Sequence, residues 1–285
     1  MNGTRTHIAE RHQLLPYLGG ETHFDLEGPS AGPVIALVPG ATLPLAVWNP
    51  LVAPLTESGF RVLRYDLLGR GHSSRLPRKA NLRTFTDQLH GLLQGLGIDG
   101  PVHLVGLALG ALIAAAYAVE PRAQVDRLAW IAPDGVRTRF TLAERLFTAP
   151  VLGDLLSRFM ADRILMARVP RYSEHQDVQR FVRQLLEFGL SRPDFRGAVL
   201  TTVRNLPIHE GEAYYQQVAE RGIPTRIVWG GQDLVTPLEA AGPLRRLFGE
   251  EALHIEDEAG HLPFLEARDP VSEVLISHFR AQAAL

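Results

Sequence analysis

The segment that decides the fold reads His103-Leu104-Val105-Gly106-Leu107-Ala108-Leu109-Gly110-Ala111. Its first half is a short apolar run typical of a buried strand, and the alanine-rich residues 109–120 have the pattern of a buried helix. A glycine stands on each side of the turn between them, where a crowded backbone leaves little room for a side chain. The segment therefore predicts a strand, a tight turn and a helix, with Ala108 at the tip of the turn.

The same alternation of short apolar runs and longer amphipathic stretches extends along most of the chain. Such an alternation is typical of a parallel sheet covered by helices, and runs that are apolar throughout indicate strands buried on both faces. We expect the first forty or so residues to add an antiparallel edge hairpin, which gives a mostly parallel sheet of eight-stranded type. The predicted strands are 34–38, 61–65, 102–105, 127–131, 226–229 and 252–255, and the predicted helices are 50–57, 84–96, 109–120, 238–248 and 270–281.

A helical insertion is predicted at residues 136–219, where the rhythm of strands stops and apolar residues recur at helical spacing. It divides the core into a first part, 1–135, and a second part, 220–285. The insertion could be ordinary helical packing or a lid that shapes a substrate pocket. Its position favours the lid, because it follows the carboxyl end of a strand, where α/β sheets of this kind bind ligands.

Four further motifs follow the ends of predicted strands in a fixed order. The first two are Val38-Pro39-Gly40-Ala41-Thr42 and Tyr65-Asp66-Leu67-Leu68-Gly69-Arg70-Gly71-His72-Ser73. The last two are Val228-Trp229-Gly230-Gly231-Gln232-Asp233 and Glu258-Ala259-Gly260-His261-Leu262-Pro263. Because carboxyl ends of parallel strands meet at one edge of a sheet, we expect these motifs to gather around Ala108.

Taken together, the motifs resemble the α/β-hydrolase fold superfamily, and within it small carboxylesterases and monoacylglycerol-lipase-like serine hydrolases, over roughly residues 20 to 280. The resemblance identifies the turn at Ala108 as the nucleophile elbow, with alanine where the family places its serine. It also implies an oxyanion hole formed by the backbone N–H groups of Ala41 and Leu109, although Pro39 stands where the family usually has histidine.

The family's remaining catalytic residues correspond to Asp233 and His261, in the expected chain order of elbow, acid and base. The resemblance implies that Asp233 orients His261, whose other ring nitrogen takes a proton from the nucleophile and returns it to the leaving group. Asp134 also follows a strand end, and a minority of the family takes its carboxylate there. It is the alternative acid.

Alanine at position 108 excludes covalent catalysis through that side chain, since a methyl group cannot attack a carbonyl. Three interpretations follow. The favoured one is a carboxylic ester hydrolase whose serine was deliberately changed to alanine to trap intact substrate, because the rest of the site is complete. The second is a natural lyase, isomerase or cyclase that uses the His261–Asp233 base and the oxyanion hole. The third is a protein that binds a ligand without catalysis.

Composition limits the partners. The chain has 285 residues with 29 Lys and Arg against 31 Asp and Glu, so its near-neutral charge favours a small, largely apolar, ester-like substrate over nucleic acid. The chain has no cysteine and no paired spacing of metal ligands, so we expect neither a metal nor a cofactor. It has no uninterrupted apolar span of the length of a membrane helix, and we expect a cytoplasmic protein that could form a homo-oligomer. The predicted pocket residues are Thr42, Trp48, Leu107, Phe159 and Phe264.

Overall fold

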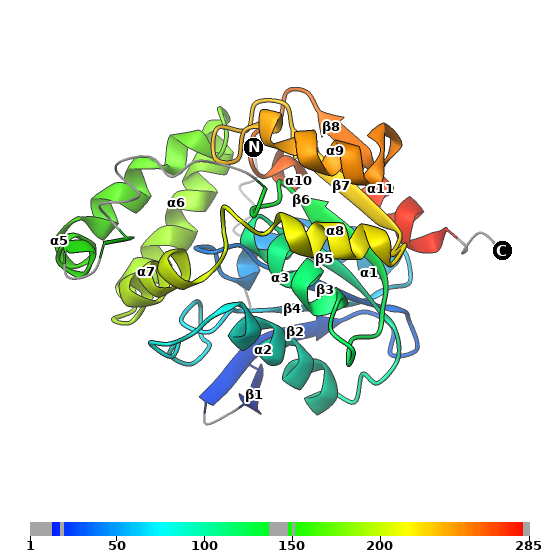
Figure 1. The fold of residues 1–285 in the computed structure, drawn as a ribbon, viewed down its shortest axis with the longest axis horizontal. Helices are drawn as coiled ribbons and strands as arrows, with labels where there is room; N and C mark the ends of the chain where they lie inside the picture. Colours follow the sequence, from blue (N-terminus) through cyan, green and yellow to red (C-terminus); the bar gives the residue numbers. More distant parts are fainter. Residues whose placement is uncertain (1–12, 18–19, 137–147, 150–151, 282–285) are drawn as a thin grey trace, which may run out of the picture.

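The computed structural model describes residues 13–17, 20–136, 148–149 and 152–281. Its central feature is an eight-stranded sheet in the order β1-β2-β4-β3-β5-β6-β7-β8 (Figure 1). The hairpin of β1 and β2 is antiparallel, β2 pairs antiparallel with β4, and all other pairs are parallel, so the predicted fold class is confirmed. The strands are β1 (Gln13–Tyr17), β2 (Gly20–Glu27), β3 (Val34–Val38), β4 (Arg61–Tyr65), β5 (Val102–Leu107), β6 (Val125–Ile131), β7 (Thr225–Gly230) and β8 (Leu253–Glu256).

Helices cover both faces of this sheet. Along β3, successive side chains alternate between the two faces, so that Ala36 and Val38 pack in one core cluster and Ile35 and Leu37 in the other. The first cluster lies under α2 (Leu82–Gly95), α3 (Leu109–Ala118), α8 (Glu212–Glu220) and α9 (Gly242–Phe248). The second lies under α1 (Asn49–Glu57), α10 (Pro263–Glu266) and α11 (Arg268–Arg280).

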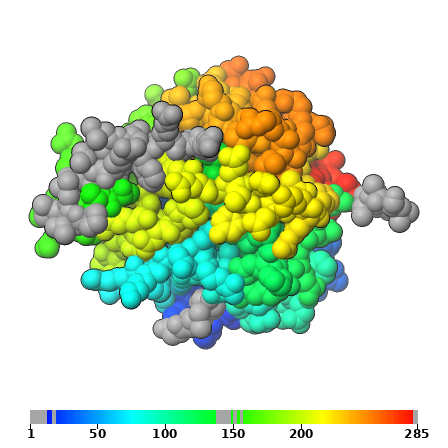
Figure 2. Space-filling view, in the orientation of Figure 1, coloured from blue at the N-terminus to red at the C-terminus, as the bar shows by residue number. Residues whose placement is uncertain are grey.

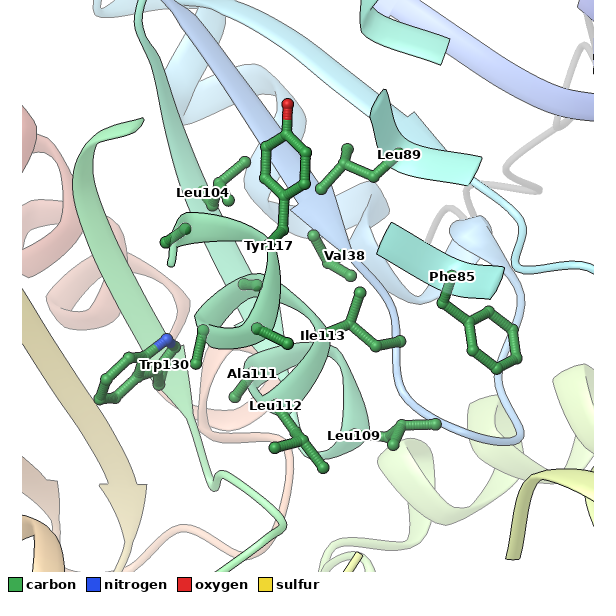
Figure 3. Packing of buried hydrophobic residues seen from close by; sticks show 14 of the residues in the cluster. Val38, Phe85, Leu89, Leu104, Leu109, Ala111, Leu112, Ile113, Tyr117 and Trp130 are labelled. Atoms are coloured by element: carbon green, nitrogen blue, oxygen red, sulfur yellow. The ribbon is translucent and has the colours of Figure 1, made fainter. Parts of the chain in front are cut away.

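The α3 helix is buried on all sides, which explains why its sequence is apolar throughout instead of amphipathic. Figure 3 shows α3 between Trp130 of β6 on one side and Phe85 of α2 on the other. Small alanine side chains along this helix let the neighbouring elements approach closely, and this fixes the point at which β5 turns into α3. The central helix therefore holds the elbow rigidly at the carboxyl edge of the sheet.

Three helices stand beside the sheet, namely α5 (Leu152–Ala167), α6 (Gln176–Ser191) and α7 (Phe195–Asn205), with a short 3-10 turn at Val169–Arg171 (Figure 1). Their green and yellow-green atoms lie at the left of the molecule in Figure 2. The main-chain N–H of His261 donates to the Tyr172 carbonyl, which follows that turn, at 2.8 Å. The Phe188 ring of α6 lies 5.1 Å from the His72 ring in the loop after β4. These contacts place the helices over the loops that leave the strand ends.

The last helix of the predicted insertion behaves differently. Although α8 falls within residues 136–219, its Tyr215 ring packs edge-on against Trp130 of β6 at 4.7 Å, so α8 belongs to the layer that covers the sheet. The predicted helix at 238–248 is also interrupted: a 3-10 turn at Leu238–Ala241 precedes α9, which has Pro243 in its first turn. Among the described residues, no helix combines the length and apolar character needed to cross a membrane.

Candidate active site

Ala108 lies between the last residue of β5 and the first residue of α3, with φ 48° and ψ −113°. A positive φ strains any residue with a Cβ, at a cost on the order of 1–3 kcal/mol. The flanking glycines are required by contact: a Cβ on Gly106 would lie 2.4 Å from Cα of Ala111, and one on Gly110 would lie 2.0 Å from the Val38 carbonyl oxygen. The elbow is thus a strained turn whose tip is fixed by close backbone packing.

Two main-chain hydrogen bonds tie this turn to the neighbouring strand. The Ala108 N–H donates to the Ile131 carbonyl at 2.9 Å, and the Asp134 N–H donates to the Ala108 carbonyl at 3.1 Å. Between them, Ala132 also has a positive φ, of 45°. The chain therefore turns sharply after β6 as well as after β5, and the second turn brings Asp134 next to the elbow.

An acid–base pair lies at the same edge of the sheet. Nδ1 of His261 is 2.8 Å from Oδ2 of Asp233, and both residues are only 3% exposed. The other carboxylate oxygen accepts the N–H groups of Val235 at 2.7 Å and Thr236 at 2.9 Å, so Asp233 is held in one orientation. A carboxylate at Nδ1 favours the tautomer that carries its proton there, which leaves Nε2 as a free base.

The loops that carry the pair are packed backbone against backbone. The Gly231 N–H donates to the Glu256 carbonyl at 2.8 Å, and the Gln232 N–H donates to the Ala259 carbonyl at 2.9 Å. A Cβ at Gly230 would lie 1.9 Å from the Gly260 carbonyl oxygen, which explains the glycine there. This close approach sets the distance between acid and base.

Tyr172 is a site residue that the sequence did not indicate. Its ring lies edge-on to the His261 imidazole, with 5.4 Å between centroids, and its hydroxyl is 3.2 Å from the hydroxyl of Thr42. One side chain from the inserted helices thus spans from the loop after β8 to the loop after β3. Nothing in the sequence around it distinguishes this tyrosine from a packing residue.

Asp134, the alternative acid, is not the hydrogen-bond partner of the imidazole. Its carboxylate accepts the Thr236 hydroxyl at 3.4 Å, and its carbonyl accepts the Tyr215 hydroxyl. Burial raises the pKa of this carboxyl, while the nearby His261 and Arg168 charges oppose the rise. It forms a second carboxyl group beside the pair, with a different set of contacts.

The loop after β3 runs alongside the elbow. A Cβ added at Gly40 would lie 3.8 Å from Cβ of Ala108, which places the next residue, Ala41, at the rim of the turn. Leu109 is the first residue of α3, and amides at that position have no acceptor within their own helix. Two N–H groups near the elbow tip, those of Ala41 and Leu109, are the candidates for binding a negatively charged oxygen.

The predicted pocket residues lie in three different environments. Thr42 is half-buried in the loop beside Tyr172. Trp48, Leu107 and Phe264 are fully buried, and Trp48 stacks on Phe264 with 5.0 Å between ring centroids, so these three pack in the core and their place in a substrate pocket stays a prediction. Large apolar residues near a buried turn pack in the core far more often than they line a cleft.

The side chain of Phe159 is 73% exposed on α5, where it lines a surface pocket together with Arg158 and Arg196, and its contact with a substrate stays a prediction. Among the side chains of that helix that the structure describes, Ser157, Ala161 and Leu165 are buried, at a spacing of four. They define the inward face, and Phe159 lies on the opposite one. Within the described parts of the chain, no three His, Asp or Glu side chains are grouped so that they could hold a metal ion.

Comparison with known proteins identifies the family to which the chain is similar. The model of the alpha/beta hydrolase fold family matches residues 33–268. A pimeloyl-acyl-carrier-protein methyl ester esterase from Vibrio atlanticus is 26% identical over 264 residues, which cover 86% of this chain and 94% of the esterase. A 2-hydroxy-6-oxononadienedioate/2-hydroxy-6-oxononatrienedioate hydrolase from Klebsiella pneumoniae is 26% identical over 265 residues, covering 86% and 84%.

Solved structures agree at the level of the fold. The crystal structure of the enol-lactonase from Burkholderia xenovorans superimposes with a TM-score of 0.78 at 21% identity, covering 94% of this chain and all of the lactonase. Because the family model spans most of the sequence and the eight-stranded sheet matches it, the chain belongs to the alpha/beta hydrolase fold family.

Proposed function

We propose that this chain has the framework of a serine hydrolase for carboxylic esters, with Ala108 in place of the serine nucleophile. The observation that carries the proposal is the buried Asp233–His261 hydrogen bond, at the same sheet edge as a strained elbow. The Asp233 carboxylate also accepts two main-chain N–H groups, which would give His261 the fixed tautomer and orientation that a general base needs.

With serine at position 108, the chemistry would follow from these groups. Nε2 of His261 would take the hydroxyl proton as the serine oxygen bonds to the ester carbonyl carbon, and the carbonyl oxygen would become an oxyanion held by the N–H groups of Ala41 and Leu109. The protonated imidazole would then give its proton to the departing alkoxide. A water molecule would release the acid by the same steps and restore the serine.

A small, largely apolar ester is the substrate class that we propose. The sequence relatives act, by their names, on a pimeloyl-acyl-carrier-protein methyl ester and on 2-hydroxy-6-oxononadienedioate or 2-hydroxy-6-oxononatrienedioate, and the fold relative is an enol-lactonase. The near-neutral charge of the chain and the apolar surroundings of the elbow support an uncharged acyl group held by burial. With alanine at position 108, such an ester would bind and remain intact.

We further propose that α5, α6 and α7 form the lid over this site. Tyr172, between α5 and α6, contacts both His261 and Thr42, so that the inserted helices contribute a side chain to the site itself. A lid in this place would exclude water and set the size of the acyl group.

The test is Ala108→Ser, assayed on p-nitrophenyl acetate, butyrate and octanoate. We expect a burst of p-nitrophenol followed by steady turnover at least about 10³-fold above the chain with alanine, in line with the loss seen when nucleophiles of this kind are removed. Adding His261→Ala should abolish the gain. If Ala108→Ser folds with unchanged circular dichroism and melting temperature but hydrolyses no ester, the proposal fails; turnover of a substrate by the unaltered chain that depends on His261 would support a lyase or isomerase instead.

A further inference from the structure

Arg70 is fully buried in the loop between β4 and α2, with 0% of its surface exposed. The glycines on either side have positive φ values, 78° for Gly69 and 48° for Gly71, and a Cβ on Gly71 would lie 1.9 Å from Oδ2 of Asp66. This tight turn directs the side chain between them inward. The sequence showed the turn as part of a family motif but gave no role to the arginine.

The guanidinium group donates to three neutral oxygens on three different segments. Nε donates to the Ala41 carbonyl at 2.8 Å, Nη1 to the Leu68 carbonyl at 3.0 Å, and Nη2 to the Thr202 hydroxyl of α7 at 2.6 Å. The planar fork thus connects its own loop, the loop after β3 and one of the inserted helices. Only arginine has donors fixed in these three directions.

This arrangement is costly for a residue with a purely structural role. Among the described residues no ion pair joins Arg70 to a carboxylate, and burial lowers the pKa of its guanidinium to about 9. A buried cation that has only neutral acceptors pays its desolvation penalty without an ion pair. A buried arginine of this kind is therefore expected where the orientation of its acceptors matters. One of the acceptors of Arg70 is the carbonyl of Ala41, in the loop beside the elbow.

We propose that Arg70 is the positioning residue of the oxyanion hole, which fixes the Ala41 peptide and makes its orientation depend on α7. The inference rests on the proposed ester hydrolysis. The Ala41 carbonyl belongs to the peptide plane after the one that carries the Ala41 N–H, so holding it fixes one of the two planes that meet at Ala41 and limits how far the other can turn. Because N–H donors stabilise an oxyanion only when they are oriented before the charge develops, a loosened Ala41 would slow the chemical step and leave substrate binding unchanged.

Kinetics of variants in the Ala108→Ser chain test this role. Removal of one oxyanion donor costs about 10²–10³ in kcat, so Arg70→Met, which only loosens a donor, should lower kcat by about 10- to 100-fold with KM within about twofold. Thr202→Val, which removes only the acceptor on α7, should lower kcat by about 3- to 10-fold. Arg70→Lys keeps the charge without the fork, and its kcat should stay well below that of the parent.

Arg127→Met is the matched control, because Arg127 is also buried but lies near the amino end of β6, where it donates to the Ala281 carbonyl. It should leave kcat and KM within about twofold of the parent, given that it lacks contact with the elbow. Equal losses in Arg70→Met and Arg127→Met, a loss confined to KM, or full activity of Arg70→Lys would overturn the positioning role.

Hydrogen exchange provides a readout that does not depend on activity. In the chain that keeps Ala108, Arg70→Met should speed amide exchange in residues 39–45 and 199–205, whereas Arg127→Met should not. If Ala108→Ser hydrolyses no ester, the proposed ester hydrolysis is refuted. The role of Arg70 in holding the loop is then tested by hydrogen exchange alone. Unchanged exchange in residues 39–45 refutes that role in either case.

Discussion

Asp233→Asn, made in the Ala108→Ser chain, tests which carboxylate serves His261. The amide oxygen of asparagine can still accept the N–H groups of Val235 and Thr236, so the loop keeps its hydrogen bonds. Its NH₂ group then faces Nδ1, which must act as acceptor, and the imidazole proton moves to Nε2. The base that should take the serine proton is lost while the geometry is kept. A tautomer error of this kind costs about 10⁴ in kcat, or about 5.5 kcal/mol of transition-state stabilisation.

The assay is steady-state hydrolysis of p-nitrophenyl butyrate, with Asp134→Asn as the matched control. Asp134 accepts a single side-chain hydroxyl at 3.4 Å and makes no hydrogen bond with the imidazole, so its loss should lower kcat by less than about tenfold. Melting temperatures of both variants should stay near that of the parent. A kcat for Asp233→Asn within tenfold of the parent, or a larger loss in Asp134→Asn, would refute the assignment of Asp233 as the acid.

Three further predictions concern stability. Burial lowers the pKa of His278 from 6.5 to about 4. Between these two pH values the histidine is protonated in the unfolded chain but neutral in the folded chain. Stability should therefore fall by about 2 kcal/mol from pH 7 to pH 5, and denaturant titrations of His278→Gln should show a weaker dependence. Gly110→Ala should fail to fold or lose more than about 3 kcal/mol, because its Cβ would lie 2.0 Å from a carbonyl oxygen; normal urea unfolding would contradict that. Phe264→Ala removes the ring stacked on Trp48 and should cost about 3–5 kcal/mol in the same measurement, and a cost below 1 kcal/mol would show that the site had collapsed without a cavity.

The strands could be predicted closely because their signal is local. Residues 34–38 and 61–65 match β3 and β4 at both ends: the first is a continuous apolar run between two prolines, and the second has an apolar centre at Val62 and Leu63. Helix starts were less accurate: α2 begins at Leu82, two residues before the predicted 84. The cap is Asn81, whose side chain accepts the Thr84 N–H, and the sequence interpretation had not used it.

The candidate site was predictable only where chain order fixes position. Ala108, Asp233 and His261 follow strands that end at one edge, so their meeting follows from a parallel sheet. The sequence favoured Asp233 over Asp134 only through the family resemblance, because β6 and β7 are neighbours and both aspartates follow a strand end; the structure adds the hydrogen bond between Asp233 and His261. What separates them is the direction of the side chain within a turn, and residue type does not encode it.

Contacts made by the inserted helices had no sequence signal at all. Helical periodicity says that α5 has one buried face but not which residue meets the sheet, and it did not show that Phe159 would be exposed. Tyr172 and Thr202 reach the site through side chains whose partners lie more than a hundred residues away. Pairings of that length depend on how the helices dock, so only a three-dimensional structure can reveal them.

The backbone at position 108 bears on what that position is built to hold. Its strain costs on the order of 1–3 kcal/mol, and glycine would adopt the same backbone without that cost. The methyl group of alanine adds no chemical function that would offset the strain. The turn is retained because Gly106 and Gly110 pack against α3 and β3, and this packing has one geometric effect, which is to project a Cβ substituent from the tip of the elbow. A serine would place its oxygen there with no change of backbone. The elbow, the Asp233–His261 pair and the loop held by Arg70 therefore have the arrangement that the proposed serine hydrolase requires.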